Sequence, residues 1–319
     1  MSKVLVISGH PELSKSFTNT VILEQLSAGL EDVEIRRLDS LYPNYQIDVN
    51  AEQQALVEAD VIVLQFPYYW YSMPALMKKW MDDVFSFNFA YGPQGDKLKG
   101  KDFILSFTVG GPEEAYSPLG YNHFSIEQLM RPLEQTAYLA GMNYRKPVYT
   151  HGMVYIPGVY NELDQVQAKA RDHANRLMAQ ISDITESASS RIRKLVAQWF
   201  AQFDQLPEQS EFFTGHLSND LNLVMPEGSF KGHEGFRDWY AFARRTFKPG
   251  CEHKVEQTLV TEKEGGYQVD LRIRLDAETF PESEPKGETI SLLVNETWQV
   301  TIDETGHVTI HDYQVTPVA

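Results

Sequence analysis

Cysteine, long apolar runs and basic residues are scarce in this chain of 319 residues. The one cysteine, Cys251, cannot form a disulfide within the chain, so no disulfide framework supports the fold. No stretch approaches the roughly 20 apolar residues that a helix needs to cross a bilayer. The 28 lysines and arginines stand against 44 acidic residues, which gives a formal net charge of −16. This balance argues against general affinity for nucleic acid or anionic membrane, since positive surface binds both.

The chain has enough apolar and aromatic residues for ordinary packed cores. Hydrophobic residues make up 42% of it and aromatic residues 12%. A length of 319 residues favours two domains over one. The first residues, MSKVLVISGHP, have a single lysine and then a strand pattern, which does not match a signal peptide. We therefore expect a cytoplasmic protein.

Strand-like and helix-like patterns alternate over the first half. Continuous apolar runs such as residues 4–8 and 61–66 are each followed by apolar residues at helical spacing. Continuous apolar strands indicate a parallel sheet that is covered on both faces. Such a doubly wound α/β sheet, with the expected strand order 2-1-3-4-5, binds ligands beyond the carboxyl ends of its strands. The expected strands are 4–8, 33–38, 61–66, 103–109 and 147–151, and the expected helices are 17–30, 52–58, 75–85, 126–140 and 163–181.

The pattern changes at residues 184–190 (ITESASS), a small polar stretch that predicts a linker or a helix cap. An amphipathic helix is expected over 192–203 and another helix over 236–247. Apolar and polar residues then alternate over 267–275 and 292–302, followed by a hairpin turn at 305–306. Helices followed by long antiparallel strands indicate an α+β domain. The expected domains are 1–183 and 191–319, with a linker at 184–190.

The loop after the first expected strand, SGHPELSKSFTN (8–19), has the features of an anion site. Ser16 is a favourable N-cap for a helix that begins near Phe17. The backbone N–H groups and the positive end of the dipole at a helix start attract an anion, and His10 is near enough to donate a further hydrogen bond. The loop lacks the GxGxxG and GxxxxGK[ST] motifs of common nucleotide-binding folds. An ordinary helix start beside a surface histidine is the alternative interpretation.

Four consecutive aromatic residues, YYWY at 68–71, follow the third expected strand. Pro67 and Pro74 stiffen the two ends of this loop, so the aromatic side chains can form a fixed wall. A flat, conjugated ligand would stack well against such a wall. A core-packing cluster or a dimer interface is the alternative interpretation.

A third loop, FTVGGPEEAYSPLGYNH (107–123), follows the fourth expected strand. Gly110 and Gly111 allow the backbone to approach a ligand closely, and Tyr116 and His123 can donate protons or hydrogen bonds to a reducible substrate. A lid with ordinary surface groups is the alternative. Because all three loops open at one edge of a parallel sheet, together they predict a flavin site. The phosphate would lie on the first loop, and the second and third loops would hold the ring.

Residues 1–183 resemble the flavodoxin-like NAD(P)H:quinone oxidoreductases. The resemblance rests on SGHPELSKSFTN, LYPNYQIDVNAEQQALVEADVIV, QFPYYWYSMPALMKKWMDDVF, FAYG and TVGG. The run LYPNYQID followed by AEQ is similar to the ancillary oxidoreductases of glutathione-regulated potassium-efflux systems. The resemblance implies a homodimer that holds a flavin without covalent attachment. It also implies ping-pong, two-electron reduction of quinones by NADH or NADPH.

Roles for individual residues follow from the same resemblance. The implied cofactor is FMN, with FAD as the alternative, and no metal is expected. Tyr116 and His123 are implied to lie beside the flavin and to assist charge redistribution during hydride transfer. Their spacing is one residue longer than in the mammalian-type enzymes, and Pro112 stands where other members often have a small residue. The positions implied to hold the flavin are His10, Ser16, Phe17, Thr18, Asn19, Pro67, Tyr68, Tyr69, Trp70, Tyr71, Thr108, Val109, Gly110 and Gly111, and those implied to line the substrate pocket of the partner subunit are Phe87, Phe89 and Tyr91.

Residues 191–319 resemble the SnoaL-like, cone-shaped α+β fold of the nuclear transport factor superfamily. The resemblance rests on the amphipathic helix, the segment LVMPEGSFKGHEGFRDWYAF and the closing hairpins. Some of these cones enclose an enzyme's pocket, whereas others only bind a ligand or dimerise. Glu296 falls on an apolar strand face, where a buried carboxyl must either pair or shift its pKa. The candidate pocket residues are His216, Asp220, His233 and Glu296.

Two other functions stand beside flavin-dependent quinone reduction. The resemblance to the potassium-efflux branch suggests a regulatory ancillary subunit that docks on a membrane transporter from the cytoplasmic side. A redox tailoring enzyme, whose second domain binds or cyclises a ligand, is the other. Bound flavin and turnover of NAD(P)H with a quinone would separate the enzyme from a flavin-free binding module. No nucleic-acid partner is expected for any of the three.

Overall fold

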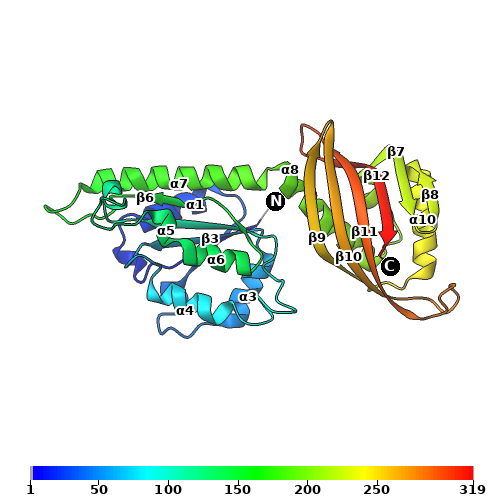
Figure 1. The fold of residues 1–319 in the computed structure, drawn as a ribbon, viewed down its shortest axis with the longest axis horizontal. Helices are drawn as coiled ribbons and strands as arrows, with labels where there is room; N and C mark the ends of the chain where they lie inside the picture. Colours follow the sequence, from blue (N-terminus) through cyan, green and yellow to red (C-terminus); the bar gives the residue numbers. More distant parts are fainter. Residues whose placement is uncertain (1–2, 319) are drawn as a thin grey trace. The chain divides into compact units, whose positions relative to one another are not determined.

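The structure is a computed structural model that describes residues 3–318. The chain divides into two compact units, Met1–Thr185 and Glu186–Ala319. Figure 1 shows the parallel sheet and its helices in the first unit and the curved, mostly antiparallel sheet of the second. Buried apolar residues form separate hydrophobic clusters in the two units, so each unit has its own core.

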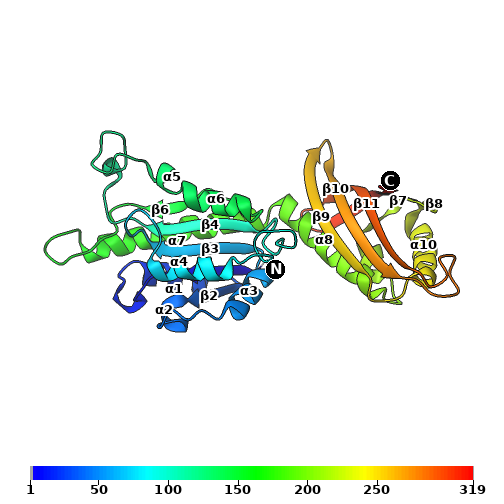
Figure 2. The ribbon, with the colours of Figure 1, turned by 60° about the horizontal axis from the view of Figure 1, so that its bottom comes forward.

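The first unit is built on a parallel sheet with the strand order β2-β1-β3-β4-β5, and β6 also pairs with β4 (Figure 2). This order confirms the predicted flavodoxin-like arrangement 2-1-3-4-5. The fifth position is shared by two short strands instead of the one expected at 147–151. The strands are β1 (Val4–Ser8), β2 (Val33–Arg37), β3 (Val61–Pro67), β4 (Asp102–Thr108), β5 (Asn143–Tyr144) and β6 (Val148–Thr150).

Both faces of this sheet are buried, which explains its continuous apolar strands. Leu5 and Ile7 of β1 belong to the cluster on one face, while Val4 and Val6 belong to the cluster on the other. Alternate residues of a strand point to opposite faces, so both sets must be apolar. Helices α3, α4, α5 and α6 supply residues to the first cluster, and α1 and α7 supply residues to the second. The helices are α1 (Asn19–Gly29), α2 (Leu38–Leu41), α3 (Val49–Glu58), α4 (Ala75–Val84), α5 (Ile126–Leu129), α6 (Arg131–Leu139) and α7 (Leu163–Thr185).

Two helix predictions need correction. The helix expected to begin near Phe17 begins at Asn19, after a short 3-10 helix at Leu13–Lys15. The helix expected over 126–140 is divided into α5 and α6. Pro132 lies in the first turn of α6, and its ring nitrogen has no hydrogen to continue the bonding of α5.

The segment 184–190 contains the end of one helix and the start of the next. α7 ends at Thr185 and α8 (Ala188–Gln205) begins at Ala188. The Ser187 hydroxyl caps α8 by accepting a hydrogen bond from the backbone N–H of Ser190 at 3.2 Å. Of the two interpretations of this polar segment, a linker or a helix cap, the structure thus shows a helix N-cap at Ser187.

The second unit is an α+β domain, as predicted. Its sheet has the order β8-β7-β12-β11-β10-β9, in which β12 and β7 run parallel and the other neighbours antiparallel. Trp199, Trp298 and Phe213 are fully buried between this sheet and the helices. The strands are β7 (Leu217–Met225), β8 (Gly228–Lys231), β9 (Glu252–Lys263), β10 (Gly266–Glu278), β11 (Thr289–Ile302) and β12 (Val308–Pro317), and the helices after α8 are α9 (Glu211–Gly215) and α10 (Gly232–Thr246).

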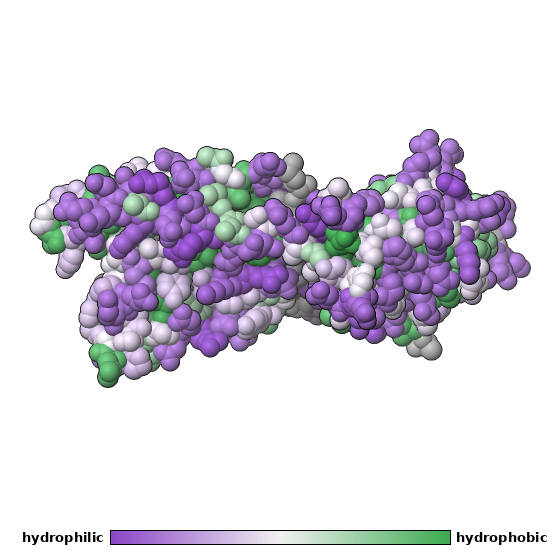
Figure 3. All heavy atoms as spheres, turned by 90° about the horizontal axis from the view of Figure 1, so that it is seen from above, coloured by the Kyte–Doolittle hydropathy of each residue, from purple (hydrophilic) through white to green (hydrophobic). Residues whose placement is uncertain are grey.

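No helix among residues 3–318 combines the length and the apolar character needed to span a membrane. The face of the protein shown in Figure 3 is mostly hydrophilic, with apolar residues scattered over it.

Candidate functional site

The predicted loops lie together at the carboxyl edge of the first sheet. Because β1, β3 and β4 are parallel neighbours, their last residues come into register: Ser8 pairs with Gln65, and Pro67 pairs with Thr108. Two backbone hydrogen bonds then continue the alignment beyond the strands. Gly9 N–H donates to the Gln65 carbonyl at 2.9 Å, and Tyr68 N–H donates to the Thr108 carbonyl at 2.9 Å. The geometry thus brings the three predicted loops to one place.

Ser16 and Asn19 order the first loop. The Ser16 hydroxyl accepts a hydrogen bond from the backbone N–H of Asn19 at 3.0 Å, so it caps the helix although Thr18 occupies the formal N-cap position. His10 is 8% exposed, and its Nδ1 accepts the backbone N–H of Glu12 at 3.1 Å. Burial lowers the pKa of His10. The neutral ring therefore carries its hydrogen on Nε2, which leaves that nitrogen as a donor.

A buried chain of hydrogen bonds supports this loop from below. The Asn19 amide donates to the Thr108 hydroxyl at 3.1 Å and accepts from the Gln65 amide at 2.9 Å. The Ser106 hydroxyl donates to Gln65 at 2.5 Å and lies 2.8 Å from Nε2 of His173 on α7. Asn19 is thereby fixed by β3 and β4, and Ser106 connects this chain of bonds to α7.

Several backbone N–H groups at this edge have no partner within residues 3–318. They belong to Phe17 and Thr18, just before α1, and to Gly110 and Gly111, just after β4. Unpaired backbone donors beside a helix N-terminus suit an anion, and donors on a glycine pair suit a carbonyl group brought close to the backbone. The side chain of Phe17 is 47% exposed and lies edge-on to Tyr155, with ring centroids 5.1 Å apart.

The aromatic loop mixes buried and exposed side chains. Tyr68 is 8% exposed, whereas Trp70 is 91% exposed. Trp70 and Tyr71 have φ angles of 48° and 63°, and a pair of backbone hydrogen bonds between Tyr69 and Ser72 closes the turn. The Tyr71 hydroxyl donates to Asn122 at 2.9 Å and thus ties the second loop to the third. The exposure of Trp70 is inconsistent with a role in the core of its own chain.

Two buried polar atoms at this edge lack partners among the described residues, the Tyr68 hydroxyl and the Ser8 hydroxyl. Burial raises the pKa of Tyr68, so its hydroxyl keeps its hydrogen. A buried hydroxyl without a partner is costly, and a bound polar ligand would relieve that cost. The edge therefore fits a ligand with polar atoms along a flat ring and an anionic end.

Tyr116 is at the site, but His123 is not paired with it. Tyr116 lies against Gly111 and 6.3 Å from the ring centroid of Tyr68. His123 is exposed, has a φ of 62°, and its side chain makes no described contact with Tyr116. The histidine beside Tyr116 is His151, with ring centroids 5.1 Å apart and Nδ1 3.3 Å from the Gly111 carbonyl. Sequence reasoning missed His151, which directly follows β6 without a motif of its own.

Of the three aromatic residues implied to line the partner subunit's pocket, one is buried and two are exposed. Phe89 is 8% exposed and belongs to the core of its own unit. Phe87 and Tyr91 are 61% and 42% exposed, and their rings meet edge-on at 5.8 Å. Only Phe87 and Tyr91 are therefore free to meet another molecule.

Of the four residues predicted to lie in a pocket of the second unit, only Glu296 lines the cavity described here. Glu296 is 5% exposed and lines a cavity of the second unit. Asp220 is exposed, while His216 and His233 are bonded to the carbonyls of Val308 and Leu217 at 2.9 and 2.8 Å. None of these three lines that cavity. Across residues 3–318, no group of three or more His, Cys, Asp or Glu side chains could hold a metal ion.

Comparisons with known proteins match the first unit of this chain to one family. Residues 2–177 match the family model described as flavodoxin-like fold. An uncharacterised NAD(P)H oxidoreductase, YdeQ of Bacillus subtilis, is 37% identical over 196 residues, which cover 61% of this chain and 94% of the relative. The glutathione-regulated potassium-efflux system ancillary protein KefF of an Enterobacter species is 41% identical over 175 residues, which cover 55% of this chain and 95% of that protein.

A solved structure shows the same likeness. The general stress protein 14 of Treponema denticola, solved in complex with FMN, is 32% identical and superposes with a TM-score of 0.51. The match covers 56% of this chain and 98% of that protein. Each of these three matches leaves more than a third of this chain uncovered.

Proposed function

This chain belongs to the flavodoxin-like fold family, and we propose that it is an FMN-dependent NAD(P)H oxidoreductase that reduces quinones by two electrons. The convergence of unpaired donors at one sheet edge carries the proposal: free backbone N–H groups before α1 and after β4, and the buried Tyr68 hydroxyl between them. The FMN in the Treponema denticola relative supports the choice of FMN. FMN would supply the two-electron exchange between NAD(P)H and the acceptor.

The first loop would hold the phosphate end of the cofactor. This loop carries four donors: the N–H groups of Phe17 and Thr18, the Ser16 hydroxyl and the Nε2–H of His10. Donors and the helix dipole together favour a dianionic phosphate at this place. Asn19 would act indirectly, because both ends of its amide are already bonded to Thr108 and Gln65.

The second and third loops would hold the ring. Tyr69 and Trp70 offer exposed aromatic faces. The backbone N–H groups in these two loops that have no partner among residues 3–318 are those of Trp70, Tyr71, Gly110 and Gly111. Stacking fixes the ring plane, and backbone donors stabilise charge that develops along its polar edge. Tyr116 would bond the reacting end through its hydroxyl, and His151 would orient Tyr116 through their ring contact. NAD(P)H and the quinone would occupy the same side of the ring in turn.

The test uses the full-length chain. Purified protein should carry a non-covalent flavin that is released by heat and identified as FMN by chromatography. It should then oxidise NADH or NADPH with menadione as the acceptor. A colourless protein that shows no turnover after addition of FMN or FAD would contradict the proposal.

A homodimer is part of the same proposal. The exposed pair Phe87 and Tyr91 would face the acceptor side of the site in a second copy, as the sequence resemblance implies. Light scattering on the FMN-loaded protein should give twice the chain mass. The variant Phe87→Ala should raise KM for menadione while the amount of bound FMN is unchanged.

Docking on a membrane transporter is the second candidate function. It is favoured by the likeness to KefF, which is named as an ancillary protein of a potassium-efflux system. Vesicles that contain such a transporter should retain the protein, whereas vesicles of the same lipids without the transporter should not. Equal retention by the two kinds of vesicle would argue against this candidate.

A further inference from the structure

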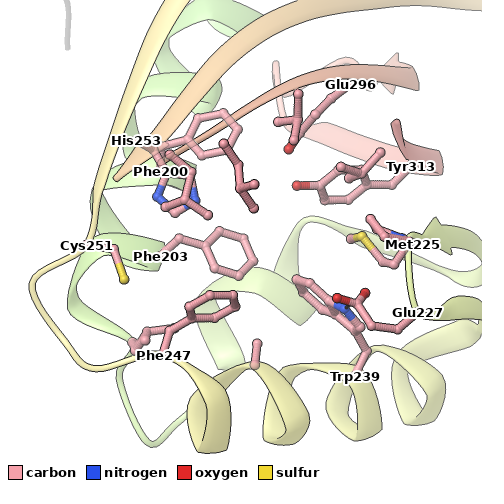
Figure 4. A pocket seen from close by; sticks show the side chains of 17 residues that line it. Phe200, Phe203, Met225, Glu227, Trp239, Phe247, Cys251, His253, Glu296 and Tyr313 are labelled. Carbon is pink, nitrogen blue, oxygen red and sulfur yellow. Dashed lines mark hydrogen bonds between the residues drawn. The ribbon is translucent and has the colours of Figure 1, made fainter. Parts of the chain in front are cut away.

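The second unit contains a cavity that the proposed redox function does not use. The cavity volume is about 130 Å³. An engineered apolar cavity of roughly 150 Å³ binds benzene, so this space suits a compound built on one small ring. Helices α8 and α10 and strands β9 to β12 surround it, and the helices contribute Phe200, Phe203 and Trp239 (Figure 4).

Aromatic and aliphatic groups dominate the lining, and it includes no lysine or arginine. A lining without lysine or arginine gives an anionic ligand no such counter-charge. Glu227 is exposed at the turn between β7 and β8, so it belongs to the rim. The aromatic side chains that could stack on a flat ligand are Phe200, Phe203, Trp239 and Phe247.

Glu296 of β11 is the buried polar group of this cavity. Its Oε2 accepts a hydrogen bond from the indole N–H of Trp298 at 3.0 Å, and the Tyr313 hydroxyl is its second partner. The Tyr313 oxygen in turn accepts from the indole N–H of Trp199 at 3.4 Å. Burial raises the pKa of Glu296 to about 8 and holds the pKa of Tyr313 well above its usual value. Both groups therefore carry their hydrogens at pH 7.

A count of hydrogens shows that this pair has a donor to spare. The neutral carboxyl of Glu296 has one O–H and Tyr313 has another, while the two indole N–H groups already have acceptors. One of the two hydroxyl hydrogens bridges Glu296 and Tyr313. The other has no acceptor among residues 3–318. Figure 4 shows the carboxyl and the hydroxyl directed into the same part of the cavity, where a ligand atom could accept that hydrogen.

His253 of β9 supplies a polar contact from the opposite wall (Figure 4). Its Nδ1 lies 2.6 Å from Oδ1 of Asp204, and the same oxygen accepts the backbone N–H of His253 at 3.0 Å. Asp204 thus fixes the ring and leaves Nε2 as the nitrogen without a described partner. The cavity therefore presents a hydroxyl donor on one wall and an oriented imidazole on the other.

We propose that this cavity binds a neutral, largely apolar aromatic compound that carries a carbonyl group, whose oxygen accepts the spare hydrogen of the Glu296–Tyr313 pair. The shape and the apolar lining select the ring system, and the pair selects the carbonyl. The proposal concerns binding and assigns no reaction to this unit.

The test compares a ketone with a hydrocarbon of nearly the same size, acetophenone and ethylbenzene. Both are offered at pH 7 to the full-length, FMN-loaded protein, and binding is measured by equilibrium dialysis. One neutral hydrogen bond predicts that the ketone binds about three- to tenfold more tightly. Equal affinity for the two compounds in the unmodified protein would overturn the proposal.

A double variant, Glu296→Leu with Tyr313→Phe, locates the preference. Near-ultraviolet circular dichroism first verifies that the variant is folded, because the indole N–H groups of Trp298 and Trp199 lose their acceptors. The variant should bind both compounds with similar affinity. A ketone preference that persists in the folded double variant would place the site elsewhere and overturn the proposal.

A change of pH tests the hydrogen count without disturbing the fold. Above pH about 8 the Glu296 carboxyl is ionised and accepts the hydrogen bond of the Tyr313 hydroxyl. No spare donor is then left, so the ketone preference should disappear by pH 9. Glu296→Gln should keep its preference at pH 9, whereas Glu227→Gln, at the rim, should behave like the unmodified protein. A preference in the unmodified protein that is equal at pH 7 and pH 9 would overturn the proposal. The other titratable or charged groups around Glu296 are Tyr313, His253 with Asp204, Cys251, Glu227, and, in an adjoining hollow of the sheet, Asp270 and Arg272.

Discussion

His173 on α7 lies 2.8 Å from Ser106 on β4, measured from Nε2 to Oγ. Its Nδ1 lies 2.9 Å from the Thr150 hydroxyl, so each ring nitrogen meets a hydroxyl group. Because the Ser106 hydroxyl donates to Gln65, it accepts from Nε2–H of His173, and the Thr150 hydroxyl donates to Nδ1. The ring is fully buried and neutral, and burial lowers its pKa to about 3.

This neutral histidine should make the first unit sensitive to acid. In the unfolded chain His173 has a pKa of about 6.5 and binds a proton below that pH, whereas the folded ring stays neutral down to about pH 3. As the pH is lowered from 6.5 to 3, the free energy of unfolding should therefore fall by about 1.4 kcal/mol per pH unit. His173→Gln should be the less stable protein at pH 7, but its deficit should shrink by about 2 kcal/mol at pH 5. Urea unfolding at the two pH values measures this, and an unchanged deficit would count against a buried neutral ring.

Ser16→Ala should weaken FMN binding and lower stability by about 1 kcal/mol, because it removes the cap on Asn19 N–H and a donor to the phosphate. Ser125→Ala is the matched control. Its hydroxyl caps α5 by accepting the N–H of Gln128 at 3.3 Å and has no contact with the first loop. Fluorescence titration with FMN should show weaker binding for the first variant only. Equal affinities in the two variants would remove Ser16 from the phosphate site.

Tyr116→Phe should slow NAD(P)H-dependent turnover about tenfold, the effect of losing one hydrogen bond of about 1.4 kcal/mol in the transition state. His151→Gln should slow it less, because His151 contacts the ring of Tyr116 and not the cofactor. His123→Ala should have little effect, since His123 is exposed and apart from Tyr116. Stopped-flow reduction at constant FMN loading compares the three. A defect in His123→Ala alone would restore the role that the sequence resemblance gave to His123.

Trp70→Ala should change stability by no more than about 0.5 kcal/mol, because 91% of the side chain is exposed. It should nevertheless weaken FMN binding if the loop is a stacking wall. Trp80→Ala is the contrasting variant. It should lower the free energy of unfolding by about 3–5 kcal/mol, because Trp80 is fully buried. Thermal unfolding without flavin and titration with flavin separate the two effects. A large loss of stability in Trp70→Ala would favour the packing interpretation.

Glu52→Ala should destabilise the first unit by about 3–5 kcal/mol. Glu52 is fully buried and accepts hydrogen bonds from Arg36, the Tyr42 hydroxyl at 2.5 Å and the Trp80 indole at 2.8 Å. Glu34→Gln is the matched control, because Glu34 also pairs with Arg36 but is partly exposed. Urea unfolding should show a small change for the control. Similar losses in the two variants would mean that the buried partners of Glu52 contribute little.

The sequence predicted the first unit better than the second for a physical reason. A strand covered on both faces is apolar at most positions, so β1, β3 and β4 appear as largely apolar runs with sharp ends. β9 was not predicted, because it is an edge strand with half-buried polar and charged residues. The unpredicted β7 mixes buried and exposed positions without regular alternation.

The candidate sites show the same division between local and distant information. The three loops were predicted because each is one continuous segment after a strand. Pairs such as His253 with Asp204, 49 residues apart, and His173 with Ser106, 67 residues apart, come from folding alone. The run AEQ helped to identify the family, yet only the structure shows that its glutamate, Glu52, binds three side chains from different elements.

The one thiol of this protein stands on the wall of the aromatic cavity in the second unit. Cys251 is 8% exposed, and burial raises its pKa, so we expect an alkylating reagent to react with it slowly. The reaction rate of Cys251 can therefore report whether a ligand occupies the cavity. Mass spectrometry of the intact chain would register a single adduct, and any compound that fills the cavity would slow its appearance.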